Sequence, residues 1–113
     1  MADIMVGALS SGEILMNVFD ENNAFSRDVG LLGRTVRGGS GMDRILAMVD
    51  PSAVDVVTPF MIRTGEETFR LETDAHDLSA GNIVQDMYDS LGRRIAAHPE
   101  QWYFLQEIHE SLP

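Results

Sequence analysis

The sequence predicts a single α/β domain in which a small mixed sheet of about three strands packs against helices. Runs of apolar and β-branched residues alternate along the chain with segments of helical periodicity, which is typical of such folds. The 113 residues are 44% hydrophobic and 23% charged, the balance of one globular domain. We therefore expect residues 1–113 to share one modest core.

The first third of the chain predicts a helix, a strand and a loop, in that order. Residues 4–9 have the composition of a short helix, and Ser10-Ser11-Gly12 ends it. The largely apolar run "EILMNVF" at 13–19 is closed by "DENN", which predicts a buried strand followed by a turn. Residues 23–37 show no periodicity and are expected to form a loop.

The middle of the chain predicts a second helix and two strands. In "GGSGMDRILAMVD" (38–50), Ser40 is the expected N-cap, Asp43 lies in the first turn and Pro51 follows the end. The β-branched segment 53–63 predicts a strand, and Pro59 within it indicates an edge position or an irregularity. Residues 68–74 alternate apolar and charged side chains, which predicts a half-exposed strand.

The last third predicts two helices separated at a proline. Apolar residues recur every four positions from Ile83 to Ile95, giving one apolar face to a helix over 82–97. His98 precedes Pro99 and is pushed out of helical geometry, while Pro99 suits the start of a new helix. Apolar spacing continues through the only tryptophan, Trp102, which we expect to be a packing residue, and then through Leu105, Ile108 and Leu112.

Composition excludes several classes of partner and site. Eighteen acids against eight arginines give a formal net charge of −10, so we expect no nucleic-acid partner. The absence of cysteine excludes disulfides and thiolate metal sites. No apolar run reaches the roughly 20 residues that span a bilayer, and the N-terminal residues lack a basic segment. We therefore expect no transmembrane segment, no secretory signal and a cytoplasmic location.

The residues alone predict no catalytic centre, metal site or cofactor. No G-x-S-x-G elbow occurs, and the three histidines lack the i, i+4 spacing of a helical metal site. The turn formed by Gly39, Ser40 and Gly41 precedes a helix, so its backbone N–H groups are candidates for binding an anion. The alternative is an ordinary turn that starts the helix.

Four segments together resemble a known family. The C-terminal string "LGRRIAAHPEQWYFLQEIH" (91–109) is similar to the signature that closes the lipid A biosynthesis (lauroyl/myristoyl) acyltransferases, a branch of the lysophospholipid acyltransferase superfamily. Three further segments resemble parts of the same domain in the same order: "MVGALSSGEILMNVFDEN" (5–22), "VGLLGRTVRGGSGMDRILA" (29–47) and "VVTPFMIRTGEETFRLET" (56–73). All four belong to the C-terminal half of the family's domain, which would make the fold half of an acyltransferase-like sandwich.

The resemblance implies transfer of a fatty acyl group from a thioester to a lipid hydroxyl. The family's catalytic element is a histidine followed after four residues by an acid, yet the residues five beyond His76 and His98 are Gly81 and Tyr103. We therefore expect this chain to be inactive alone. The implied partners are a chain carrying the N-terminal half, acyl carrier protein and lipid, at the inner face of the cytoplasmic membrane.

Three residues fall on positions that contact substrate in the family. Asp20 matches a strand-end acid of the acyl-acceptor site, Arg34 a Gly-Arg loop, and Arg63 a basic residue at a strand end. Their alternatives are a turn residue, a solvated loop residue and a strand-end charge. Two other hypotheses stay open for the chain: a non-catalytic binding or interaction module that self-associates as a homo-oligomer, or an unrelated small α/β domain.

Overall fold

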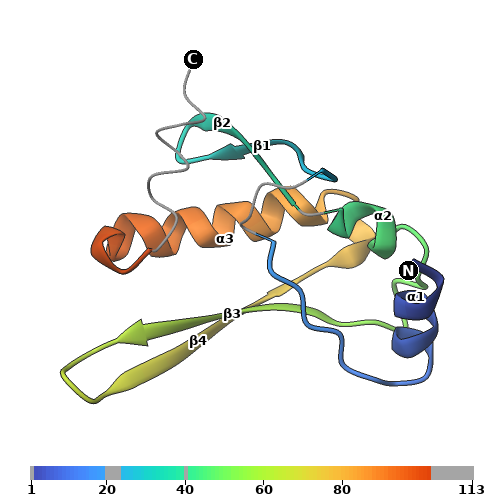
Figure 1. Ribbon diagram of the computed structural model, residues 1–113, viewed down its shortest axis with the longest axis horizontal. Coiled ribbons are helices and arrows are strands. Elements are labelled where there is room, and N and C mark those ends of the chain that lie inside the picture. The colour runs from blue at the N-terminus through green and yellow to red at the C-terminus, as the bar shows by residue number, and fades with distance from the viewer. Residues whose placement is uncertain (1, 20–23, 40, 103–113) are drawn as a thin grey trace.

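The computed structural model describes residues 2–19, 24–39 and 41–102 and confirms the predicted α/β class (Figure 1). The elements are α1 (Ala2–Ser10), β1 (Arg27–Leu31), β2 (Arg34–Gly38), α2 (Met42–Leu46), β3 (Val56–Arg63), β4 (Phe69–His76), the 3-10 turn η1 (Leu78–Ala80), α3 (Ile83–Ala97) and the 3-10 turn η2 (Pro99–Gln101). Among the described residues, the strands form two separate antiparallel hairpins, β1–β2 and β3–β4, rather than one mixed sheet of three strands.

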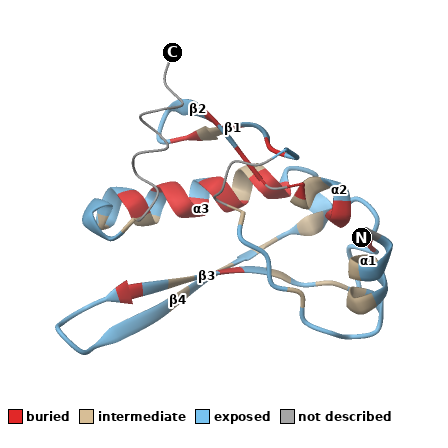
Figure 2. Cartoon of the chain, viewed as in Figure 1, coloured by how far each residue is buried: buried red, intermediate tan, exposed pale blue. Residues whose placement is uncertain are grey.

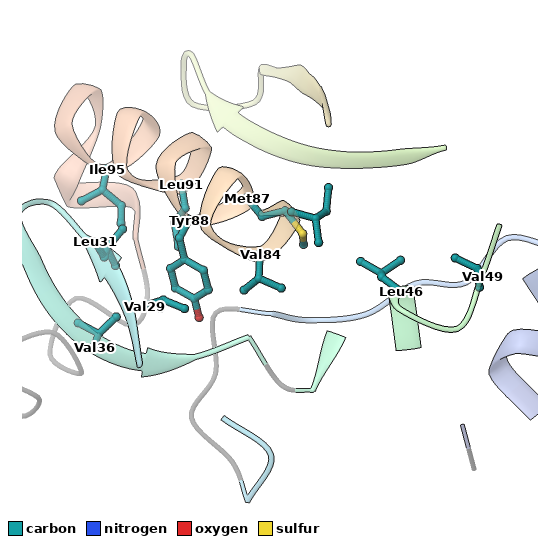
Figure 3. Packing of buried hydrophobic residues seen from close by; sticks show 11 residues of the cluster. Val29, Leu31, Val36, Leu46, Val49, Val84, Met87, Tyr88, Leu91 and Ile95 are labelled. Atoms are coloured by element: carbon teal, nitrogen blue, oxygen red, sulfur yellow. The ribbon is translucent and has the colours of Figure 1, made fainter. Parts of the chain in front are cut away.

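Helix α3 is the centre of the molecule and lies between the two hairpins (Figure 1). Its predicted apolar face is confirmed, because Ile83, Met87, Leu91 and Ile95 are all buried. They pack with the inward side chains of β1–β2 and with α2, as Figure 3 shows. The buried cluster consists of Val29, Leu31, Val36, Leu46, Val49, Ile83, Val84, Met87, Tyr88, Leu91 and Ile95.

The loop expected at 23–37 is wrong, because the structure places a β-hairpin there. Val29, Leu31 and Val36 point into the core at alternate positions of β1 and β2. Leu32 and Gly33 join the strands with positive φ values of 53° and 76°, the geometry that suits a two-residue hairpin turn. The alternation covers only five residues in each strand, which is too short to stand out as a pattern.

The strand expected at 13–19 is also wrong. In the described part of the chain, backbone hydrogen bonds reach this segment only at its ends, from Glu13 N to Ala8 O and from Gly39 N to Phe19 O. Ile14 and Met16 are 91% and 87% exposed, so the segment is not buried either. Its apolar composition suits a strand, but no strand of the described residues pairs with it.

The helix expected after the glycine-rich turn is confirmed, but α2 is only five residues long. Its N-cap is Gly41, in the left-handed region at φ 80°, and not Ser40, which lies outside the described residues. Asp43 lies in the first turn as predicted. At the other end of the chain, His98 ends α3 and Pro99 begins a 3-10 turn, while the helix expected beyond Trp102 lies outside the described residues.

The inward side chains of the β3–β4 hairpin are mostly apolar on β3 and polar on β4: Ile62 is buried, and Val56 and Phe60 pack against the core. Register pairs Thr58 with Asp74 and Met61 with Leu71. Glu72, Asp74 and His76 of β4 are half-buried, whereas Phe69 and Leu71 are each 59% exposed, as the largely blue hairpin in Figure 2 indicates. Pro59 lies in the middle of β3, and neither strand pairs with a third among the described residues. Its edge position is therefore confirmed.

Candidate functional site

An apolar groove of about 540 Å³ lies between β3, α3 and the segment 14–19. Such a volume lies within the range of small-molecule sites, roughly 300–1,000 Å³. Its floor is the core-facing side of α3, with Met87, Leu91 and Ile95. Leu15 and Trp102 line it from opposite ends of the chain, and both are half-buried. We call this hollow the α3 groove.

One wall of the α3 groove is a strand edge. Nine consecutive residues, 54–62, line it, and the six residues 14–19 line the facing side. A strand whose face lines a cavity contributes alternate residues, because successive side chains point to opposite faces. Consecutive lining therefore indicates that the free edge of β3 faces the groove.

A polar cluster closes the groove where α3 meets the hairpin. The Arg94 guanidinium binds Asp74 through two hydrogen bonds, Nη1 to Oδ2 at 2.8 Å and Nη2 to Oδ1 at 3.2 Å. Its Nε lies 2.9 Å from Glu72 Oε1 as an ion pair without hydrogen-bond geometry. The same guanidinium stacks over the Phe60 ring, 4.8 Å from the centroid. Both carboxylates therefore neutralise the one arginine that lines the groove.

The carboxylate of Asp74 is the strongest acid of this cluster. Hydrogen bonds from Arg94 and then from the Ser90 hydroxyl, at 2.7 Å, lower the pKa of Asp74 from 3.8 to about 2. The hydrogen bond from Arg70 is the main cause that lowers the pKa of Glu72. Both side chains are ionised at neutral pH and bind Arg94 as anions.

A hydroxyl and an imidazole lie close together at the same wall. Thr58 Oγ1 and His76 Nε2 are 2.8 Å apart. Burial lowers the pKa of His76 below 6.5, although the nearby Asp74 and Asp86 carboxylates oppose this shift, so the ring is neutral at pH 7. Thr58 is 2% exposed. The pair is a buried hydrogen bond between the strands, with its hydroxyl withdrawn from solvent.

A second, polar hollow of about 360 Å³ lies between β4 and the exposed side of α3. It is lined by His76, Asp86, Asp89 and Arg93, among others. In the ranges that the structure describes, no three histidines or acids come together as a metal site would require. This hollow is therefore an acidic surface, and its residues do not form a set of metal ligands.

Of the residues assigned by resemblance, Arg34 and Arg63 do not line the α3 groove. Arg34 begins β2 and Arg63 ends β3, so they belong to different hairpins, and neither lines the groove. Arg63 Nε and Nη2 donate to the carbonyls of Gly65 and Glu66, which fixes its side chain at the hairpin turn. Asp20 lies outside the described residues. The substrate-binding role of all three stays a prediction.

The glycine-rich turn is used for packing. The N–H of Gly39 donates to the Phe19 carbonyl and to the Tyr88 hydroxyl, each at 3.0 Å, so this amide is already committed. A Cβ on Gly41 would come within 3.1 Å of Phe25 Cβ. The Gly39 amide is thus engaged in an internal contact, Ser40 lies outside the described residues, and the anion-binding role of this turn stays a prediction.

Comparison of the chain with protein-family models, curated proteins and solved structures gives no match. The family resemblance thus rests on the four sequence segments alone. Within the described ranges, no helix is long and apolar enough to cross a bilayer.

All four segments of the resemblance contribute to the α3 groove. Leu15 comes from the first, Ile45 from the second, Phe60 from the third, and Leu91 and Trp102 from the last. Sequence reasoning found the segments but not the groove, because it assigned them to separate helices, strands and a loop and could not show how these elements meet. Only the unpaired apolar run at 14–18 was a possible signal, since it has no partner of its own in the sequence.

Proposed function

We propose that this chain is a non-catalytic relative of the C-terminal half of lipid acyltransferases, and that it binds a fatty acyl chain in the α3 groove. The observation that supports this most is the convergence of the four resembling segments on one apolar groove. Transfer of each methylene from water to such a site contributes roughly 0.8 kcal/mol, so a long acyl chain gains most from it.

The charges around the groove favour a neutral head group. Arg94 is neutralised by Asp74 and Glu72, so it offers no excess positive charge to a carboxylate or phosphate. An acyl chain in an ester or thioester linkage suits these surroundings better than a free fatty acid. Acyl carrier protein thioesters and acylated lipids are the corresponding partners, met in the cytoplasm or at the inner face of its membrane.

The described histidines support binding without transfer. His76 is neutral and could accept a proton, but its Nε2 is engaged with a hydroxyl that is itself buried. His98 lies at the end of α3, 4.0 Å from Glu100, and acts as the residue that stops the helix. A chain with the N-terminal half would supply the histidine–acid element under this proposal.

The single tryptophan allows a direct test. Trp102 lines the groove, so a monoglyceride whose acyl chain carries two bromine atoms should quench its fluorescence on binding, since bromine quenches indole at contact. The titration is carried out below the aggregation concentration of the lipid. We expect saturable quenching by the brominated lipid and none by the unbrominated one.

Two leucine variants provide the matched control. Leu15 lines the groove and Leu71 does not, so Leu15→Glu should weaken quenching about tenfold or more in apparent Kd, while Leu71→Glu should leave it unchanged. Quenching that is not saturable, or that responds equally to both variants, would contradict binding in the groove.

A second candidate is an interaction module that takes up a strand. The free edge of β3 along the groove is the observation that favours it, because an exposed edge is a template for an added strand. A chain carrying the N-terminal half would supply that strand. In this case the monoglyceride fails to quench Trp102, and the β3 amides gain protection from hydrogen exchange only when the partner chain is added.

A further inference from the structure

Residues 14–18, which we call the strap, line the α3 groove on the side that faces β3. One end of the strap is held at α1, where the N–H groups of Gly12 and Glu13 donate to carbonyls of the helix. At the other end, the Phe19 carbonyl accepts a hydrogen bond of 2.6 Å from the Tyr88 hydroxyl. Between these ends, no backbone group of the described residues bonds to the strap backbone. The strap is therefore held at both ends and unpaired in between.

The contacts of Gln101 show which backbone groups of β3 face the groove. The Gln101 side-chain amide, which lines the groove, accepts from the Arg63 N–H at 2.8 Å and donates to the Arg63 carbonyl at 3.1 Å. Both polar groups of Arg63 thus point away from β4. Residues of an antiparallel strand alternate in this respect, so the backbone groups of Val57 and Met61 also point to the open edge. In the described part of the chain, nothing binds them.

The strap has the composition of the strand that this edge lacks. Its side chains Ile14, Met16 and Val18 are 91%, 87% and 55% exposed, which leaves three large apolar groups in water. Leu15 is half-buried, so a strap paired with β3 through the same inward side chain would place the other three beside Val57 and Met61. Such cross-strand apolar pairs stabilise a sheet, and the pairing would also satisfy backbone groups of both segments.

Filling of the groove decides whether this pairing is stable. A closed hollow of about 540 Å³ with nothing inside would leave its apolar walls without contacts, and the lost dispersion opposes closure. An acyl chain supplies those contacts and gains a further apolar wall when the strap closes over it. Because a ligand shifts an equilibrium toward the state that it binds better, an acyl chain favours the closed strap.

We propose that the strap closes over an acyl chain in the α3 groove and adds to β3 as an edge strand. This inference rests on the proposed binding of an acyl chain, and it names the element that encloses the ligand. Release of the ligand then requires the strap to unpair, which slows dissociation. The closed strap also occupies the edge that a strand of a partner would use, so acyl-chain binding and strand uptake exclude each other.

Amide-resolved hydrogen exchange of the full chain, with and without the unbrominated monoglyceride, tests the closure. The lipid is kept below its aggregation concentration, and quenching of Trp102 by the brominated form measures binding in parallel. We expect the amides of Val57 and Met61, and alternate amides of the strap, to exchange about tenfold or more slowly with lipid bound. The amides of Thr58 and Phe60 pair with β4 already and should change much less.

Val57→Pro tests the pairing directly, with Val57→Ala as its matched control. Both variants change the same side chain, but only proline removes an N–H from the open edge. The natural Pro59 has the same parity, so β3 tolerates the missing donor there. We expect Val57→Pro to weaken protection of the strap and to release the brominated lipid about tenfold faster than Val57→Ala, a difference of about 1.4 kcal/mol. Recovery of Trp102 fluorescence in stopped flow gives the rate, and circular dichroism verifies folding.

The results separate this inference from the proposed function. Saturable quenching of Trp102 without added protection of the strap would overturn closure and leave acyl-chain binding intact. Strap amides that are equally protected with and without lipid would indicate a permanent strand and would also overturn it. Absence of quenching would contradict acyl-chain binding and this inference together. Protection of the β3 edge only in the presence of a chain carrying the N-terminal half would assign that edge to a partner strand instead of the strap.

Discussion

Arg94 connects α3 to both strands of the β3–β4 hairpin. Its guanidinium takes part in two hydrogen bonds to Asp74, an ion pair with Glu72 and a stacking contact with Phe60 on β3. The neighbouring Arg93 reaches Asp74 only at 3.4 Å, and 63% of its side chain is exposed. Two adjacent arginines therefore differ strongly in what they contribute to the fold.

Replacing each arginine by alanine should separate these contributions. Arg94→Ala removes a partly buried, bidentate pair and a cation–π contact, and should lower the free energy of unfolding by about 1–3 kcal/mol. Arg93→Ala should change it by less than about 0.5 kcal/mol, since its contact is exposed and screened. Urea titration of both variants is the measurement, and equal losses would contradict the assignment.

At the residue scale, local patterns predict what lies within one helix. The spacing from Ile83 to Ile95 identifies the buried face of α3 because helical neighbours are close in sequence. The ion pair between Arg94 and Asp74 joins residues 20 positions apart, and nothing in the local sequence indicates it. Trp102 packs against the core cluster as expected, but the local sequence does not indicate that it is half-buried and lines the groove.

At the element scale, the two hairpins contact α3 differently. Hairpin β1–β2 places Val29, Leu31 and Val36 in the core, while β3–β4 combines charged and hydroxyl contacts to α3 with the packing of Val56, Phe60 and Ile62. Strands 53–63 and 68–74 were predicted from their composition, and the structure confirms both as β3 and β4. The face that each strand buries depends on its neighbours, which alternation alone does not reveal.

Hydrogen exchange should distinguish the paired elements from the unpaired segment. The amides of α3 and of the paired positions of β1–β2 lie in the core and should exchange slowly, whereas those of residues 14–18 should exchange fast because no backbone carbonyl of the described residues accepts from them. Amide-resolved exchange in the dilute monomer is the measurement. Strong protection of residues 14–18 would show that they pair as the sequence predicted.

At the scale of the whole molecule, charge and exposed surface are both large. The chain carries a net charge of −10 and exposes 7,435 Å², roughly a fifth more than the scaling rule gives for a compact monomer of 12.5 kDa. Composition predicted the charge and the single domain. It could not predict the groove or the exposed apolar side chains of the β3–β4 hairpin, because both depend on how the two hairpins dock on α3.

The net charge of −10 predicts that the thermal stability of the folded chain depends on salt concentration. Self-repulsion among excess acids destabilises the folded chain, and added salt screens it within a Debye length of about 10 Å at 0.1 M. The thermal midpoint of the chain at low protein concentration should therefore rise when sodium chloride is increased from a few millimolar. A midpoint that falls instead would mean that ion pairs such as Arg94–Asp74 outweigh the repulsion.

Pro59 affects the tendency of this protein to aggregate at high concentration. Two open strand edges beside an apolar face are the features from which fibrils grow, because each added chain can extend a continuous ladder of backbone hydrogen bonds. Proline has no N–H, and it interrupts such a ladder at the middle of β3. The ring of Pro59 therefore disfavours extension of a hydrogen-bonded ladder from the β3 edge.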